Sequence, residues 1–397
     1  MNPLIQRFES LLQLADFQSA SDIHLSPDKP VYLRRFGLLT ATEGPQWRSD
    51  EIDELLRLVL HAQQEATFKE SQSLDFAYTS PNGPRFRVNL FLERQRTSLA
   101  IRRIEQQIAD FDSLHLPPCL ERLTSIQDGL MLVTGPTGSG KSTTLNAIID
   151  RINRQTPQHI ITIEDPIEQI HQENQSLIHQ RELFTDVPSY HQGIKDALRE
   201  DPDIILVGEM RDPDTMRTVI SAAETGHAVF STLHTSDAVG SVNRILGSFT
   251  AAEQTSIRHQ LSMVLQAVVS QRLIMTRDRD ARVPVVEVLW GTKAVCNHIR
   301  TGRLEQIYTL MESGSQHGMM TREQSLAHHV GEETISLDEA LRMAKDPKIL
   351  VDLLRYQNRQ GKQDPESMTA FENANTAFLS RTGSRASTTT NNSQLVS

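Results

Sequence analysis

Cysteine is nearly absent from this chain of 397 residues, which contains only Cys119 and Cys296. Two cysteines this far apart cannot build a disulfide framework or a four-cysteine zinc site within the chain. Long apolar runs are also missing, since no stretch reaches the roughly 18 apolar residues of a membrane-spanning helix. The sequence therefore argues against a disulfide-rich protein, a four-cysteine zinc module and an integral membrane protein.

A secretory signal and an excess of positive charge are lacking as well. Residues 1–17 carry apolar side chains at helical spacing but no continuous apolar segment or cleavage site, so we expect core packing there and a cytoplasmic protein. The net charge of −10 argues against a surface that binds nucleic acid. A local basic pore is still compatible with a chain whose net charge is negative.

The composition is that of a soluble protein long enough for two domains, with 38% hydrophobic and 23% charged residues. We expect a small α/β domain in residues 1–105, a linker in 106–118 and a larger domain in 119–356. Residues 357–397 form a polar tail in which the apolar pattern fades, and we expect it to be disordered.

Apolar patterns predict the elements of both domains. In the first we expect helices over Leu4–Phe17 and Asp50–Lys69 and strands over Ile23–Leu25, Val31–Leu33, Arg85–Phe91 and Ser98–Ile101. In the second we expect parallel strands over Leu130–Val133, His159–Ile163, Asp203–Val207, Ala228–Leu233 and Val283–Val288. The last third predicts helices over Asn297–Leu310, Thr321–His329, Ser336–Ala344 and Pro347–Tyr356.

One segment between a predicted strand and a predicted helix has the complete pattern G-x-x-x-x-G-K-[ST] of a phosphate cradle. Its glycines let backbone N–H groups approach phosphates, Lys141 adds a positive charge, and the Ser142 hydroxyl is placed to hold Mg²⁺. The sequence therefore predicts that a nucleoside triphosphate binds here. The predicted site comprises Gly135, Pro136, Thr137, Gly138, Ser139, Gly140, Lys141, Ser142 and Thr143.

Carboxylates end two of the predicted strands. Glu209 follows the strand Asp203–Val207, and Glu164, Asp165 and Glu168 follow His159–Ile163. Ligands bind at the carboxyl ends of strands in such sheets, and an acid at this place lies beside Mg²⁺ and the attacking water. A solvated acidic surface is the alternative reading of this cluster.

Histidine and arginine complete the set of candidates. His227 and His234 flank the strand Ala228–Leu233, and His234 at its carboxyl end is placed to sense a γ-phosphate. A structural role is the alternative for both. Phosphoryl transfer also needs cations on the γ-phosphate, often from another domain or subunit. The candidate arginines are Arg85, Arg87, Arg102 and Arg103 in the first domain and Arg199 and Arg211 in the second; we expect Arg85 and Arg103 to be surface residues.

Four long motifs, GPTGSGKSTT, TIEDPIE, LREDPDIILVGEMRD and ETGHAVFSTLHT, resemble those of the type IV pilus and type II secretion motor ATPases. The chain is most similar to the pilus retraction group of that superfamily, PilT and PilU. The resemblance covers residues 1 to about 356 and includes the segment Leu265–Gln271, which we expect to be helical. The scarcity of cysteine and the early cradle also favour the retraction group.

The resemblance implies a PAS-like first domain and a RecA-like P-loop ATPase domain, with ATP between them. It implies a homo-hexamer that withdraws pili, bound to an inner-membrane platform protein on the cytoplasmic side. Glu168 would be the general base, with Glu164 as the alternative. By the same resemblance Glu209 would support Mg²⁺, His227 and His234 would form a histidine box, and Arg87 and Arg102 would form an arginine clamp.

Several functions stay open at this point. The segment Ala294–Arg300 matches the AIRNLIR-like helix of retraction motors only loosely, which is compatible with an accessory motor that works with a paralogous retraction ATPase. The motifs are also compatible with a secretion or conjugation ATPase that moves another cargo, with a nucleic-acid translocase and with a non-catalytic ring partner.

Overall fold

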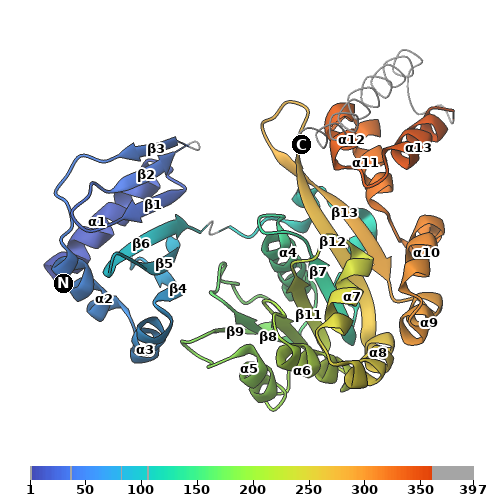
Figure 1. Ribbon diagram of the computed structural model, residues 1–397, viewed down its shortest axis with the longest axis horizontal. Coiled ribbons are helices and arrows are strands. Elements are labelled where there is room, and N and C mark those ends of the chain that lie inside the picture. The colour runs from blue at the N-terminus through green and yellow to red at the C-terminus, as the bar shows by residue number, and fades with distance from the viewer. Residues whose placement is uncertain (1, 36–37, 82, 105–106, 360–397) are drawn as a thin grey trace, which may run out of the picture.

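The computed structural model describes residues 2–35, 38–81, 83–104 and 107–359, and the predicted tail lies almost wholly outside them. Two sheets with separate hydrophobic cores make up the described chain (Figure 1). No helix of the described part is long and apolar enough to cross a membrane. The predicted domain limits stay a prediction.

The first sheet is antiparallel, in the order β3-β2-β1-β6-β5-β4. Its strands are β1 (Asp22–Leu25), β2 (Tyr32–Arg35), β3 (Leu38–Ala41), β4 (Ser73–Thr79), β5 (Arg85–Glu93) and β6 (Arg96–Arg103). Along β5, Phe86, Val88 and Leu90 are buried while Arg85 and Arg87 point to the other face. The apolar face packs against α1 (Pro3–Phe17) and α2 (Ser49–Val59), and the opposite face carries Arg85, Arg87 and Asn89 of β5.

The single helix predicted over Asp50–Lys69 is wrong, because the chain forms α2 and then α3 (Ala62–Ser71). Leu60 has an extended backbone, and the N–H of His61 donates to Oε1 of Gln64 at 3.0 Å. This capping contact starts a second helix.

The second sheet has the order β13-β12-β7-β11-β10-β8-β9. Its strands are β7 (Gly129–Thr134), β8 (His159–Glu164), β9 (Leu177–Glu182), β10 (Ile204–Val207), β11 (Ala228–Leu233), β12 (Leu265–Met275) and β13 (Arg282–Trp290). All pairs are parallel except β12 with β13. The sheet is thus mixed, and the carboxyl ends of β7, β8, β10 and β11 meet at one edge.

Helices surround this sheet and extend beyond it (Figure 1). Those between its strands are α4 (Lys141–Gln155), α5 (Tyr190–Ala197), α6 (Pro213–Glu224), α7 (Ala238–Gly247) and α8 (Ala251–Val264). Those after it are α9 (Lys293–Thr301), α10 (Ile307–Ser313), α11 (Arg322–Gly331), α12 (Leu337–Met343) and α13 (Pro347–Arg359). The end of the β12–β13 hairpin packs with α11, α12 and α13 in a third apolar cluster that includes Ile274, Val283 and Leu326.

Two further sequence predictions fail in this domain. The segment Leu265–Gln271 is the start of β12 and not a helix, because a strand buried on both faces has no polar alternation to distinguish it. The helix predicted over Asn297–Leu310 is broken after α9 by Gly302, whose φ of +74° ends the helix.

Candidate active site

The predicted cradle lies between β7 and α4. Gly138 and Gly140 have φ values of +77° and +84°, which suit glycine. Pro136, Thr137 and Gly138 are exposed, as are Ser142 and Thr143 at the start of α4, while Ser139 is buried. The loop thus presents its backbone and the first turn of a helix to solvent, as anion binding requires.

Lys141 lies over this loop. Its ammonium group donates to the carbonyl oxygens of Gly135 at 3.0 Å and Pro136 at 3.1 Å. Burial lowers the pKa of Lys141, and the nearby carboxylates of Glu209 and Glu168 oppose that shift. The acids that end β10 and β8 therefore lie close enough to the cradle to affect its lysine, as the strand order predicts.

Glu209 and His234 meet at the carboxyl ends of neighbouring strands β10 and β11. The Nε2–H of His234 donates to Oε2 of Glu209 at 3.2 Å, and the Arg211 guanidinium pairs with the other carboxylate oxygen. The Glu209 side chain is 11% exposed and that of His234 is 50% exposed. Glu209 is thus held in place by the Arg211 guanidinium and the His234 imidazole, and half of the His234 side chain is open to solvent.

The two candidate bases have different surroundings. Glu164 is buried at the end of β8, and its Oε1 accepts hydrogen bonds from Thr162 Oγ1 at 2.6 Å and Gln180 Nε2 at 3.2 Å. Burial raises the pKa of Glu164 to about 7, although both hydrogen bonds oppose the shift. Glu168 is half-buried, and its Oε1 lies 3.6 Å from Nη1 of Arg87. Both carboxylates are at the predicted edge.

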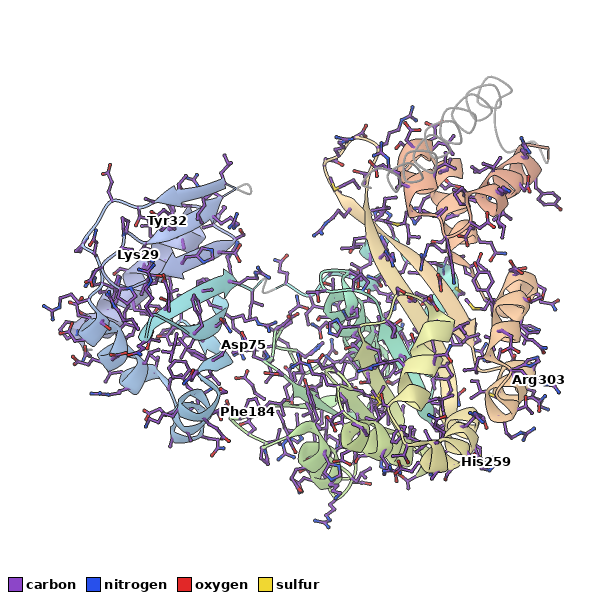
Figure 2. The ribbon with its side chains drawn as sticks, in the orientation of Figure 1. Lys29, Tyr32, Asp75, Phe184, His259 and Arg303 are labelled. Atoms are coloured by element: carbon purple, nitrogen blue, oxygen red, sulfur yellow. The ribbon has the colours of Figure 1, made fainter. Side chains whose placement is uncertain are left out.

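Arg85 anchors the first domain to the second. Its Nε donates to the carbonyl of Ile167 at 2.9 Å and its Nη2 to Oε2 of Glu182 at 3.0 Å. The two charged side chains are only 15% and 9% exposed, and burial raises the pKa of Glu182 while Arg85 opposes that shift. The expectation that Arg85 is a surface residue is therefore wrong. Figure 2 shows Asp75 of β4 on the side of the first domain that faces Phe184 of the second.

Arg87 reaches the same edge of the second sheet, but Arg102 does not. Arg87 pairs with Asp75 at 3.5 Å and with Glu168 at 3.6 Å. Arg102 lies opposite Arg87 in the β5–β6 ladder, yet its side chain is 72% exposed and pairs with Asp22 of the same domain at 2.8 Å. The structure thus brings one of the two predicted clamp arginines to the candidate site.

His227 lies at the amino end of β11, seven positions before His234. Seven strand residues span roughly 20 Å, so the two histidines stand at opposite edges of the sheet. The Nδ1 of His227 lies 3.1 Å from both the Ala222 carbonyl oxygen and Thr225 Oγ1. Within one chain the structure does not bring His227 to the site.

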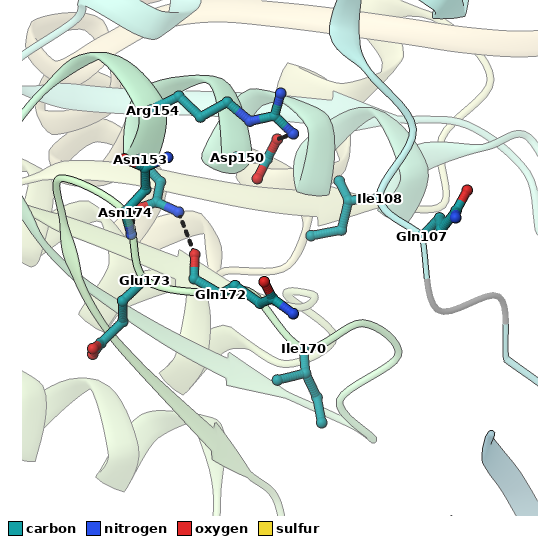
Figure 3. A pocket seen from close by; sticks show the side chains of 9 residues that line it. All are labelled: Gln107, Ile108, Asp150, Asn153, Arg154, Ile170, Gln172, Glu173 and Asn174. Carbon is teal, nitrogen blue, oxygen red and sulfur yellow. Dashed lines mark hydrogen bonds and ion pairs between the residues drawn. The ribbon is translucent and has the colours of Figure 1, made fainter. Parts of the chain in front are cut away.

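Two of the cavities that border α4 differ in what they could hold. One of about 300 Å³ adjoins the cradle at Gly140 and Thr143 and is also lined by His115, Leu273 and Arg282. Its position beside the phosphate loop suits the base or sugar of a nucleotide. The other, of about 520 Å³, lies on the outer side of α4 (Figure 3).

Several polar groups that line the outer cavity are already paired with one another. Asn153 Nδ2 donates to the Gln172 carbonyl at 2.7 Å, and Arg154 pairs with Asp150 at 2.8 Å. This arrangement gives no reason to place a ligand there.

The residues at the cradle fit a magnesium ion. Ser142 and Glu209 offer a hydroxyl and a carboxylate, the hard oxygen ligands that Mg²⁺ prefers. No group of three or more His, Cys, Asp or Glu side chains in the described chain could hold a metal ion. Mg²⁺ commonly uses only one or two protein ligands together with substrate phosphates, so this donor set is compatible with it.

Comparison with known proteins decides the family. A family model described as type II/IV secretion system protein matches residues 1–350. The chain belongs to this family of secretion ATPases. It is 39% identical over 338 residues to the type IV pilus retraction ATPase PilT of Pseudomonas aeruginosa, covering 85% of this chain and 98% of PilT. It is 34% identical over 349 residues to the type IV pilus ATPase PilU of the same species, covering 87% and 91%.

A crystal structure of the pilus retraction motor PilT with bound ADP has a TM-score of 0.77 and 38% identity to this secretion ATPase, covering 86% of this chain and 97% of that one. The predicted resemblance, the fold class and the ATPase activity are thereby confirmed. The roles predicted for individual site residues stay predictions.

The sequence patterns did not reveal two residues that shape this ATPase site. Glu182 ends β9, an edge strand with no clean alternation, and it holds Arg85. Gln271 lies beneath the cradle on β12 and is 2% exposed. One feature of the sequence could have indicated Gln271: it is a polar amide inside an apolar run, and a buried amide needs a hydrogen-bonding partner.

Proposed function

We propose that this ATPase forms a homo-hexameric ring that hydrolyses ATP with Mg²⁺ and drives type IV pilus retraction, the basis of twitching motility. The observation that carries the proposal is the 39% identity to PilT, which covers 98% of that retraction ATPase. The family model likewise matches residues 1–350 and not only the cradle. Arg85 and Arg87 of the first domain pair with carboxylates of the second. These contacts support the same function, because a motor must link nucleotide hydrolysis to the movement of another domain.

The proposed chemistry uses the residues at the sheet edge. The cradle Gly135–Thr143 and Lys141 bind the phosphates, and the cavity beside Gly140 and Thr143 takes the rest of the nucleotide. The PilT structure contains ADP, which supports an adenine nucleotide here. Ser142 and Glu209 would hold Mg²⁺, which neutralises phosphate charge when bound.

Glu168 would orient the attacking water as general base, with Glu164 as the alternative. His234 would sense the γ-phosphate, because its imidazole is half exposed beside Glu209. Arg87 would stabilise charge on the transferred group, since its pair with Glu168 is exposed and exchangeable. Arg102 and His227 could serve only through another arrangement of the domains or a neighbouring subunit.

The proposed partners follow from this function. The ring would lie on the cytoplasmic face of the inner membrane, against a pilus platform protein, and no nucleic acid is expected. If the protein is an accessory motor, a paralogous retraction ATPase joins it. The 34% identity to the type IV pilus ATPase PilU and the loose match of Ala294–Arg300 are compatible with this second candidate. A secretion ring ATPase with another cargo is a further alternative.

Catalysis is tested with the variant Glu168→Gln. It should abolish ATP turnover and retain nucleotide binding, because it removes the base and leaves the cradle intact. Glu173→Gln, a matched change at an exposed glutamate of the outer cavity, should keep full turnover. Full activity of Glu168→Gln would overturn its assigned role.

Retraction is tested by deleting the gene and restoring it as wild type or as Glu168→Gln, with surface pili and twitching as readouts. Excess pili that only the wild-type gene removes would support a retraction motor. Bald cells would indicate an assembly motor. Unchanged pili would contradict a primary retraction role. A change in pili or twitching that appears only when a paralogous ATPase is also deleted would indicate an accessory motor.

A further inference from the structure

Gln271 is a buried polar residue directly beneath the phosphate cradle. It lies on β12, the strand next to β7, and is 2% exposed. Its side chain forms part of the wall of the cavity beside Gly140 and Thr143. None of the chemistry described above uses this residue.

The carboxamide of Gln271 makes two hydrogen bonds, one to the phosphate loop and one to the first turn of α4. Nε2 donates to the carbonyl of Ser139 at 2.7 Å, and Oε1 accepts from Thr144 Oγ1 at 2.9 Å. A carbonyl oxygen can only accept, so the nitrogen must be the atom that faces Ser139. The orientation of the amide is therefore fixed, and it ties the loop to the first turn of α4.

This contact determines where the next N–H group points. In a trans peptide the C=O of one residue and the N–H of the following residue point in opposite directions. Gln271 draws the Ser139 carbonyl toward β12, so the N–H of Gly140 must point away from β12. In a phosphate cradle the side away from the neighbouring strand is the space enclosed by the loop, where backbone N–H groups meet phosphates.

Two glycines of the cradle are shaped around the same residue. A Cβ atom on Gly140 would lie 2.8 Å from Nε2 of Gln271. A Cβ atom on Gly135 would lie 2.3 Å from the main-chain oxygen of Gln271. Both distances are shorter than real Cβ contacts. Gly135 needs glycine because it meets the main chain of β12, whereas Gly140 meets the end of a side chain and is favoured as glycine by its φ of +84°.

We propose that Gln271 is a positioning residue of the cradle, whose carboxamide holds back the Ser139 carbonyl and so aims the Gly140 N–H at a bound phosphate. Nucleotide affinity then depends on a hydrogen-bond donor at position 271. The residue touches no reacting atom and acts through the loop.

The variant Gln271→Glu tests this dependence, because its donor can be added or removed by pH. Above about pH 8 a carboxylate would face the carbonyl of Ser139, and two acceptors repel. Below about pH 6 a carboxyl group made stable by burial would donate its proton to that carbonyl and replace the amide. We expect binding of a fluorescent ADP analogue to weaken roughly ten- to hundredfold at high pH and to recover at low pH.

The wild type is measured at each pH as the reference, because it also has ionisable side chains near the nucleotide. His115 and Arg282 line the same cavity, and Lys141 lies on the loop. Gln271→Met keeps the length of the side chain without its hydrogen bonds and should bind weakly at every pH. Thr144→Ser keeps the hydroxyl and should bind as the wild type does. Thermal unfolding shows whether each variant is folded at the temperature of the binding assay.

A purely structural Gln271 would lower the unfolding temperature and leave the affinity of the folded protein unchanged. Wild-type affinity of folded Gln271→Met would overturn the proposal. So would a folded Gln271→Glu that stays weak at low pH. Neither result would affect the pilus proposal, which Glu168→Gln and the pilus counts test separately.

Discussion

Replacing Glu164 by glutamine should stabilise the protein at pH 8 and have little effect near pH 4.5. Burial is the main cause of the raised pKa of Glu164, about 7 against an ordinary value of 4.5. The folded protein therefore holds a proton between these values that the unfolded chain releases. Stability consequently falls as pH rises from about 4.5 to about 7 and stays low above that range.

The expected gain follows from the size of the shift. Each pKa unit corresponds to about 1.4 kcal/mol, so a shift of about 2.5 units costs the wild type about 3 kcal/mol at pH 8. Glutamine carries no such cost, and its Oε1 can still accept from Thr162 and Gln180, the two donors that Glu164 uses. The variant should thus be about 3 kcal/mol more stable at pH 8.

Urea unfolding of both proteins across this pH range measures the difference. The gain should shrink to less than about 1 kcal/mol by pH 5. Glu173→Gln, at an exposed glutamate, should change the unfolding free energy by less than about 0.5 kcal/mol at every pH. A gain that does not vary with pH, or a less stable Glu164→Gln at pH 8, would refute the reasoning.

The same variant separates the two candidate bases. With Glu168 as the base, Glu164→Gln should keep measurable ATP hydrolysis. With Glu164 as the base, it should abolish hydrolysis, and the wild-type rate should fall as pH drops through about 7, since a base must be deprotonated. ATPase assays of the wild type and the variant between pH 6 and pH 8 decide between these results.

Three further predictions follow from single contacts. Arg85→Ala should destabilise the packing of the two domains by about 3–5 kcal/mol, because it leaves the carboxylate of its partner buried and unpaired, and limited proteolysis of the linker should show it. Arg322 pairs with Glu287 at 2.7 Å deep in the second domain, so Arg322→Met should cost a similar free energy of unfolding, whereas the double variant with Glu287→Met should regain most of it in the same unfolding assay. His234→Asn should lower the kcat of ATP hydrolysis about tenfold or more while His227→Asn should not, and the reverse result would place His227 in the site of a neighbouring subunit.

Much of the second domain could be predicted because its signals are local. The nine cradle residues are contiguous, and their strand and helix flank them directly. Glu209 and His234 could be placed together because parallel strands end at one edge, and the structure has them 3.2 Å apart. Sequence spacing is sufficient where neighbouring strands carry the residues.

Other parts depend on contacts that no local pattern records. β12 is buried on both faces, so its apolar run was compatible with a helix. Period-two alternation does show that Arg85 and Arg87 share a face of β5, but it does not show what that face meets. The partners Glu182 and Glu168 lie about 80 to 100 residues further along the chain, and only the packing of the domains brings them together.

The two arginines of β5 make pairs of very different strength, and this difference bears on how the domains can move. The pair of Arg85 with Glu182 is almost fully buried, so separating its charges would leave a desolvated carboxylate at a cost of about 3–5 kcal/mol. The pair of Arg87 with Glu168 is more than one third exposed and 3.6 Å long, and such pairs contribute about 0–1 kcal/mol. Arg87 lies two positions from Arg85, about 7 Å along the strand, so it can exchange its carboxylate for a phosphate while the neighbouring contact keeps the domains joined. Under the proposed function, a tight contact beside a loose one on a single strand would give the first domain a pivot next to the nucleotide, and the charge at the site would decide which group Arg87 contacts.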